Sequence, residues 1–155
     1  MGNRGKRSIA LDLKKPDALC IVPRLATDCD VFLESFRPGV SDRLGLSYEA
    51  KKAVSPDVLY LSVSGFGQDG IYRDRPATDT ELQAFPGLMS INKGLDGIPH
   101  RVGMLAVGTS AALHAFQALQ AALYAQRDVG GGGRWIQIDL MRTTASFLTQ
   151  KIAEY

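Results

Sequence analysis

The sequence predicts an α/β protein with a parallel, Rossmann-like sheet and helices on both faces. Short runs of strand-forming residues alternate with segments of helical periodicity along the first half of the 155-residue chain. The run at 58–63, VLYLSV, is apolar almost throughout, which is typical of a strand buried on both faces of a parallel sheet. The hydrophobic fraction of 45% and the charged fraction of 22% are those of an ordinary globular domain. Strands separated by helices therefore predict a doubly wound sheet.

Two strands are predicted in the first 33 residues. Residues 8–13, SIALDL, alternate apolar and polar side chains and predict the first strand. A helix is expected over 17–26, and Pro23 should kink it or end it early. The apolar run at 31–33 predicts the second strand.

The second strand leads into a turn that carries two arginines. Arg37 begins the turn sequence RPG, and Ser41 is expected to cap a short helical turn that Gly45 ends. Arg37 and Arg43 then flank one strand-to-helix junction. Ligands of open α/β sheets bind at the carboxyl ends of strands, and two guanidinium groups suit a phosphate-bearing ligand. The alternative is that both arginines are solvated surface residues.

The third strand, at 58–63, lies between two predicted helices. Ser47 starts a helix over 47–54, which Ser55-Pro56 ends. Gly65 and Gly67 follow the strand and allow either close approach of a ligand or a tight turn.

The second half of the chain is expected to contain helices, one glycine-rich loop and one more strand. These elements are a helix from about residue 79 to near 87, a loop at 92–99, a long alanine-rich helix over 109–126, a strand over 135–140 and a last helix from 141 onward.

Composition and charge exclude several classes of function. The net charge of +2 is too small to predict a nucleic-acid or membrane partner, and no apolar run reaches about 18 residues. Cys20 and Cys29 have no CxxC spacing, so no metal site or disulfide framework is expected, and both read as interior residues of a cytoplasmic protein. His100 beside Arg101 is expected at the surface and His114 in an interior or interface position, rather than as catalytic bases.

Three blocks in this order carry a resemblance to a known family: NRGKRSIALDLKKPD, DVFLESFRPGVSDRLGLSYEA and SPDVLYLSVSGFGQDGIYRDRPATD. Together they resemble the class III CoA-transferases, which include formyl-CoA transferase, carnitine CoA-transferase and alpha-methylacyl-CoA racemase. The resemblance runs from about Asn3 to Phe147 and covers an interior slice of a longer protein. It implies that residues 1–155 are part of the large CoA-binding domain and an incomplete slice of the family fold. The abrupt start at Met1 implies a missing first βα unit and a truncated or split reading frame.

The resemblance also implies acyl-CoA and a carboxylic acid as substrates, with no metal. The positions that it assigns to the CoA site are Leu11, Asp12, Leu13, Lys14, Ser35, Phe36, Arg37, Arg43 and Asp79. From the residues alone, Asp12 and Lys14 could simply mark a strand end, and Asp79 could be a helix N-cap. Thr78 occupies the position of the histidine that racemases of the family use, which argues against racemisation.

The nucleophile of the family is an aspartate, because a carboxylate can both attack a thioester and leave from a mixed anhydride. The resemblance places this aspartate at Gly108, between the anchor RVG at 101–103 and the helix that contains Leu113. Glycine cannot form an acyl intermediate, and the neighbouring Thr109 has no base near it in sequence. Arg142 is a further departure, at a position where relatives carry an acid.

Two functions from different classes follow. The first is a CoA-transferase chain that has lost its own nucleophile and needs a catalytic partner subunit, in an interlocked homodimer or a heteromer with a large exposed apolar surface. The second is a non-catalytic acyl-CoA-binding protein or truncated remnant. A generic nucleotide-binding Rossmann module is disfavoured, because no GxGxxG follows a first strand.

Overall fold

The computed structural model describes residues 3–27, 29–129 and 131–154. Its sheet contains β1 (Val31–Glu34), β2 (Leu59–Ser64) and β3 (Arg134–Asp139) in the order β1-β2-β3. Both pairs are parallel, with Leu61 opposite Leu33 on one side and Ile136 on the other. The predicted parallel α/β sheet is confirmed, and each of these strands lies within one residue of its expected position.

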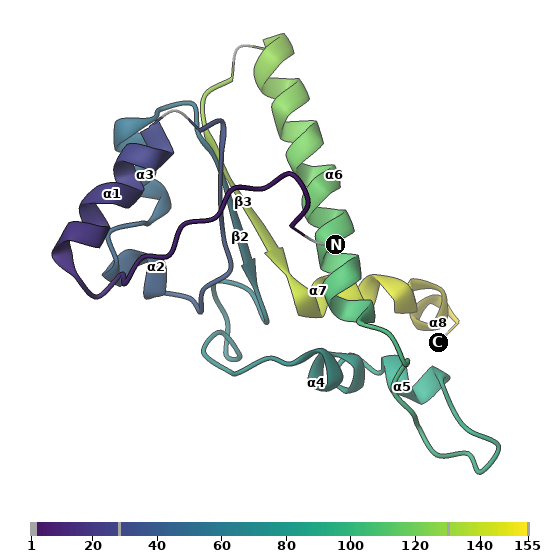
Figure 1. Ribbon diagram of the computed structural model, residues 1–155. Coiled ribbons are helices and arrows are strands. Elements are labelled where there is room, and N and C mark those ends of the chain that lie inside the picture. The colour runs from purple at the N-terminus through teal and green to yellow at the C-terminus, as the bar shows by residue number, and fades with distance from the viewer. Residues whose placement is uncertain (1–2, 28, 130, 155) are drawn as a thin grey trace.

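Helices cover both faces of the sheet, as predicted (Figure 1). One face carries the first three helices, and the long helix α6 lies on the other, where it contacts β2 and β3. The helical elements are α1 (Pro16–Thr27), α2 (Val40–Arg43), α3 (Tyr48–Val54), α4 (Asp79–Ala84), α5 (Leu88–Ile91), α6 (Ala106–Val129), α7 (Leu140–Ala145), the 3₁₀ turn η1 (Ser146–Leu148) and α8 (Thr149–Ala153).

The core is centred on β2. Leu59, Tyr60 and Leu61 are each at most 1% exposed, which explains why this run is apolar without alternation. Leu61 lines the groove beneath α6, whereas Tyr60 stacks on Phe32 of β1 with ring centroids 5.2 Å apart. Burying a side chain of this size contributes about 1.5–3 kcal/mol, so β2 provides much of the stability that holds both layers together.

The predicted strand at 8–13 is wrong. The segment forms no regular element, and Ile9 is 60% exposed. Alternation of apolar and polar residues gives a segment the tendency to form a strand, but a strand exists only when a neighbour pairs with its backbone. In the described part of the chain β1 pairs only with β2, so its outer edge is open and Leu33 is 60% exposed there.

Three details of the helices differ from expectation. Pro23 neither ends nor shortens α1, which continues to Thr27, and the Thr27 hydroxyl donates to the Pro23 carbonyl at 3.0 Å. Ser41 lies inside α2 instead of capping it, because Gly39 is the N-cap residue. The last helix is broken into α7, η1 and α8.

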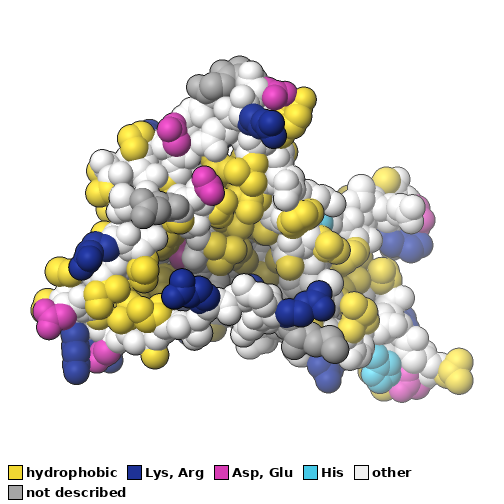
Figure 2. Space-filling view, turned by 45° about the horizontal axis from the view of Figure 1, so that its top comes forward, with side chains coloured by type: hydrophobic (Ala, Val, Ile, Leu, Met, Phe, Trp, Pro, Cys, Tyr) yellow, Lys and Arg dark blue, Asp and Glu magenta, His cyan; other side chains and the backbone are white. Residues whose placement is uncertain are grey.

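Apolar side chains are common on the surface of this molecule. Figure 2 shows them gathered in a hollow near the centre of the face in view. Cys20 is also exposed, so its predicted interior position is wrong, whereas Cys29 is half-buried and donates to the Ala26 carbonyl at 3.1 Å. Within the described ranges, no helix is both long and apolar enough to cross a bilayer.

Candidate functional site

The carboxyl end of β1 is shaped by Glu34. This carboxylate is 7% exposed and accepts a hydrogen bond from the Phe36 N–H at 2.8 Å, which fixes the exit from the strand. The chain then turns, and the Val40 N–H donates to the Arg37 carbonyl at 3.0 Å. Gly39 closes this turn with φ 77°, a left-handed conformation that favours glycine. The turn predicted from the RPG sequence is therefore present, and it leaves the Arg37 side chain exposed.

Four arginines from two segments gather around this turn. Arg37 lines a cavity of about 330 Å³ together with Arg73 and Arg75. A Cβ placed on Gly39 would lie 3.5 Å from an Nη of Arg73 and 3.7 Å from an Nη of Arg43. No ion pair of the four is found in the part of the chain that the structure describes. The carboxyl edge of the sheet therefore carries concentrated positive charge.

Sequence reasoning missed Arg73 and Arg75. Both belong to the segment 71–76, IYRDRP, which reads in isolation as a charged, irregular loop. The available signal was its place in the chain, because it follows β2, whose carboxyl end lies beside that of β1. Basic residues that follow neighbouring parallel strands are expected at the same edge.

Packing holds this second loop in place. A Cβ on Gly65 would collide with the Cβ of Ala77, so glycine here permits two backbone segments to pack closely. Phe66, Tyr72 and Phe85 form a cluster with ring centroids 5.0–5.7 Å apart. The Arg75 guanidinium lies over the Phe85 ring at 5.4 Å. Gly65 thus allows close packing against Ala77, while Gly67, with φ 98°, is a turn residue.

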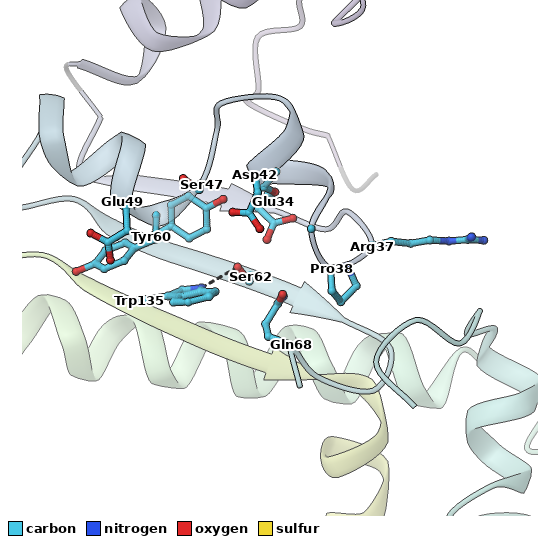
Figure 3. Close-up of a pocket in the computed structure, with 13 residues that line it drawn as sticks. Glu34, Arg37, Pro38, Asp42, Ser47, Glu49, Tyr60, Ser62, Gln68 and Trp135 are labelled. Atoms are coloured by element: carbon cyan, nitrogen blue, oxygen red, sulfur yellow. Dashed lines mark hydrogen bonds between the residues drawn. The ribbon is translucent and has the colours of Figure 1, made fainter. Parts of the chain in front are cut away.

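A smaller cavity of about 120 Å³ lies beneath the turn, on the side of α3 (Figure 3). Its lining includes the rings of Tyr48, Tyr60 and Trp135, and the Trp135 indole donates to the Ser62 hydroxyl at 2.9 Å. Burial raises the pKa of Tyr60, whose hydroxyl donates to the Leu46 carbonyl at 2.7 Å. Figure 3 shows Arg37 pointing away from this cavity. The aromatic residues therefore support the turn, and Arg37 faces outward from it.

The segment 11–14 forms a turn before α1. Asp12 and Lys14 are exposed, and Leu11 and Leu13 are half-buried. The Asp12 carboxylate accepts from the Lys14 N–H at 3.1 Å, in a turn that precedes α1. These residues do not line the cavity that contains Arg37, and their role at a CoA site stays a prediction.

Asp79 connects α4 to the beginning of α6. Thr78, and not Asp79, is the N-cap of α4, in a capping box with Glu81. One oxygen of Asp79 accepts from the side-chain amide of Gln83 at 2.6 Å, and the other accepts from the N–H groups of Val107 and Gly108 at 3.2 and 3.3 Å. Asp79 therefore satisfies two of the N–H groups that the first turn of α6 leaves free.

Gln83 strengthens this connection. Its side chain is fully buried, accepts from the Val102 N–H at 2.7 Å, and donates toward the carbonyls of Val102 and Met104 at 3.4 Å. Because Asp79 and Gln83 hold residues 102–108, α6 begins at Ala106 instead of the expected 109.

Gly108 lies in the first turn of α6 with open space beside it. A Cβ added there would meet no atom within 4 Å. Gly108 lines an apolar groove of about 430 Å³ between α6 and the sheet. Ser35, Val63 and Leu140 line both this groove and the arginine cavity, so the two spaces adjoin. The cavity lined by Arg37 therefore adjoins the groove that contains Gly108, the position that the resemblance assigns to the nucleophile.

The remaining candidate side chains lie outside the groove that contains Gly108. Thr109 and His114 line a different apolar cavity, and His114 Nδ1 lies 2.9 Å from the Ser110 carbonyl oxygen. His100 is exposed, with its ring 3.8 Å from Asp96. The Arg142 side chain lies 3.3 Å from Asp139, the N-cap of α7. No cluster of three potential metal-ligating side chains occurs among residues 3–27, 29–129 and 131–154.

These features define a parallel α/β protein of the Rossmann-like class, with a charged cleft at the carboxyl edge of its sheet. Comparison with known proteins is more specific, because residues 1–155 match the model of CoA-transferase family III. The chain belongs to this family.

Individual relatives agree with the family assignment. The chain is 38% identical over 153 residues to succinyl-CoA:glutarate CoA-transferase of Mus musculus, covering 99% of the chain and 35% of that protein. It is 40% identical over 151 residues to acetyl-CoA:oxalate CoA-transferase of Acetobacter aceti, covering 94% and 38%. The crystal structure of a CaiB/BaiF family protein from Brucella suis matches with TM-score 0.93 and 33% identity, over 99% of this chain and 40% of that one. The chain thus spans less than half the length of these relatives.

Proposed function

We propose that this chain forms the CoA-binding part of an enzyme that transfers CoA from an acyl-CoA to a carboxylic acid. The observation that carries the proposal is the adjoining pair of spaces at the sheet edge. One space is lined by Arg37 and suits phosphate groups. The other is an apolar groove that Gly108 helps to line. A CoA ligand has this same division, with phosphates at one end and a thioester at the end of a long, uncharged arm. The relatives named CoA-transferases support this assignment.

We further propose that the chain needs a partner subunit for catalysis. Transfer requires a nucleophile that attacks the thioester carbonyl, expels the CoA thiolate and later leaves from the resulting anhydride. A carboxylate meets both requirements, whereas Gly108 has no side chain. A subunit that retains the family aspartate would supply the step, in a heteromer or an interlocked dimer. The oligomeric state and the cytoplasmic location stay predictions.

Restoring the carboxylate tests the proposal directly. We expect Gly108→Asp to gain CoA-transfer activity toward a panel of acyl-CoA donors and carboxylate acceptors, because a Cβ at this position meets no atom within 4 Å. Gly108→Asn is the matched control, since it has nearly the same shape but lacks the nucleophilic oxygen pair. Circular dichroism should first show that both variants fold.

The outcomes separate the two candidate functions. Activity of the unmodified chain after addition of a homologous subunit that retains the aspartate would support the partner requirement. CoA binding without activity in either experiment would favour the alternative, a non-catalytic acyl-CoA-binding protein, which the glycine at position 108 also permits. Activity of the unmodified chain alone would contradict the assignment of Gly108 as the nucleophile position.

A further inference from the structure

The small cavity on the side of α3 contains a buried carboxylate without a positively charged partner. Glu34 is 7% exposed, lines this cavity and forms no ion pair within the described ranges. One of its oxygens accepts from the Phe36 N–H, and the other accepts from no residue that the structure describes. In this part of the chain no buried side-chain oxygen is both sealed and unpartnered, so the second oxygen opens into the cavity. A buried charge is costly unless it is paired, which makes a cation the favourable neighbour here.

Further negative charge lies around the same cavity. Asp42 and Glu49 also line it, and Figure 3 shows both together with Glu34. Burial raises the pKa of Tyr60, and the negative charges of Glu34 and Asp42 raise it further. Arg37 reaches the rim, but its side chain points away (Figure 3). The interior of the cavity therefore favours positive charge.

Aromatic rings supply the second feature that binds cations. Tyr48, Tyr60 and Trp135 line the cavity, and the Tyr60 ring stands at 70° and 90° to the other two. The faces of such rings attract cations, and tryptophan does so most strongly. The Lys52 amine lies 5.5 Å from the centre of the Tyr48 ring, whereas no lysine or arginine of the described residues lies over Trp135. The ring of Trp135 is therefore left for a cation that comes from outside the chain.

The arrangement favours an organic cation over a metal ion. Ca²⁺ and Mg²⁺ need several oxygen ligands that converge at about 2.0–2.6 Å. No group of three potential metal-ligating side chains occurs within the described ranges, so the carboxylates are too widely spaced for that geometry. An alkylated ammonium ion spreads its charge over several methyl groups and can contact ring faces and carboxylates together. The volume of about 120 Å³ is slightly below the roughly 150 Å³ of a cavity that holds benzene, so about five non-hydrogen atoms fit.

We propose that this cavity binds a small organic ammonium ion, with Glu34 and Asp42 as the counter-charges and the Trp135 ring as the aromatic contact. The proposal does not rest on CoA transfer, because none of its steps uses the CoA site. Each oxygen of Glu34 then has its own role. One holds the Phe36 N–H at the end of β1, and the other faces the ligand.

Trp135 makes the site directly measurable, because it is the only tryptophan of the sequence. The probe is tetramethylammonium chloride, titrated at constant ionic strength while tryptophan fluorescence is recorded. We expect a saturable change in fluorescence. tert-Butanol is the matched neutral ligand, since it has nearly the same shape without the charge, and it should bind at least about tenfold more weakly.

Two variants test the counter-charges. Glu34→Gln keeps an oxygen for the Phe36 N–H and removes the charge, so tetramethylammonium should bind about tenfold more weakly. Asp42→Asn changes an exposed residue and should weaken binding by about threefold. Asp74→Asn is the control, because Asp74 is an exposed carboxylate outside the lining of the cavity, and its affinity should stay unchanged.

The unmodified protein alone can overturn the site. Fluorescence that shows no saturable change with tetramethylammonium would do so, as would equal affinity for tert-butanol. Equal affinities of Asp42→Asn and Asp74→Asn would also contradict the proposal. Circular dichroism shows whether Glu34→Gln folds, and if it does not, Asp42→Asn decides between the outcomes.

Discussion

Lys51 is the least expected residue of the core. Lys51 is only 2% exposed, and its amine lies 5.0 Å from the centre of the Phe32 ring. Burial lowers the pKa of Lys51 from its usual 10.5. The contact with the ring offsets part of the cost of removing the charged amine from water. A methionine would fill the same space without that cost.

We therefore expect Lys51→Met to raise the free energy of unfolding at neutral pH, by up to about 1 kcal/mol. The folded-state pKa of Lys51 is below the unfolded value, so the unfolded chain binds more protons between the two values. The unmodified protein gains stability relative to the variant as the pH rises through that window. The advantage of Lys51→Met is full below the lowered folded-state pKa and disappears as the pH approaches about 10.5.

Urea unfolding at pH 7 and at pH 10.5 measures this difference. Lys52→Met is the control, because Lys52 is exposed and should show little change at either pH. A variant that is less stable at pH 7 would mean that the contact between Lys51 and Phe32 outweighs desolvation.

Arg37 and Arg43 are exposed at the turn that follows β1. Each should contribute a charge-assisted hydrogen bond to a bound phosphate, of roughly 1.5–3 kcal/mol. Arg37→Ala and Arg43→Ala are therefore expected to weaken CoA binding by about tenfold or more, measured by calorimetry with Arg24→Ala as the control. Unchanged affinity in both would remove the turn after β1 from the CoA site.

At the scale of elements, the start of α6 depends on a residue from another helix. Asp79 accepts hydrogen bonds from two N–H groups in the first turn of α6. These bonds also benefit from the partial positive charge at a helix N-terminus. The geometry around Gly108 is therefore set by α4 as much as by α6 itself.

Removing this cap should loosen the first turn of α6. We expect Asp79→Ala to lower the free energy of unfolding by about 1.5–3 kcal/mol, because two N–H groups lose a charged acceptor. Hydrogen exchange at Val107 and Gly108 should become faster, while the middle of α6 keeps its protection. Asp74→Ala, an exposed change in the preceding loop, is the control. Unaltered exchange at both amides would show that the rest of α6 holds the turn without Asp79.

The sequence predicted those elements whose signal is local. The apolar run of β2 and the Ser47 cap of α3, which accepts from the Ala50 N–H at 3.3 Å, can be read from neighbouring residues. The strand expected at 8–13 failed because pairing depends on a second strand, about which local alternation carries no information. The early start of α6 was missed for a related reason, since its cap comes from Asp79, far away in the chain.

The arrangement of the candidate site was predictable only in part from the sequence. Arg37 and Arg43 could be placed at one junction because they follow a single strand within a few residues. Arg73 could not be added from local pattern, because its position depends on aromatic contacts that join its loop to Phe85. The resemblance supplied what spacing could not, namely the prediction that position 108 is where relatives carry their nucleophile.

Many large apolar side chains of this protein are exposed. Large side chains are exposed on β1, on α6 and near the C-terminal end of the chain, including Leu33, Leu113, Phe116 and Phe147. The expected exposed apolar surface is therefore present. The dimer or heteromer that would cover it stays a prediction.

Among the residues that the structure describes, the outer edge of β1 has no pairing strand, and this affects how the protein meets other chains. An unpaired strand edge with an exposed leucine is a template for fibrils when it is long and flat. β1 has only four residues and ends at the buried carboxylate of Glu34. Stacked fibril segments usually need about six or seven residues. This edge is therefore long enough to receive one well-matched neighbour and too short to recruit an endless series of them.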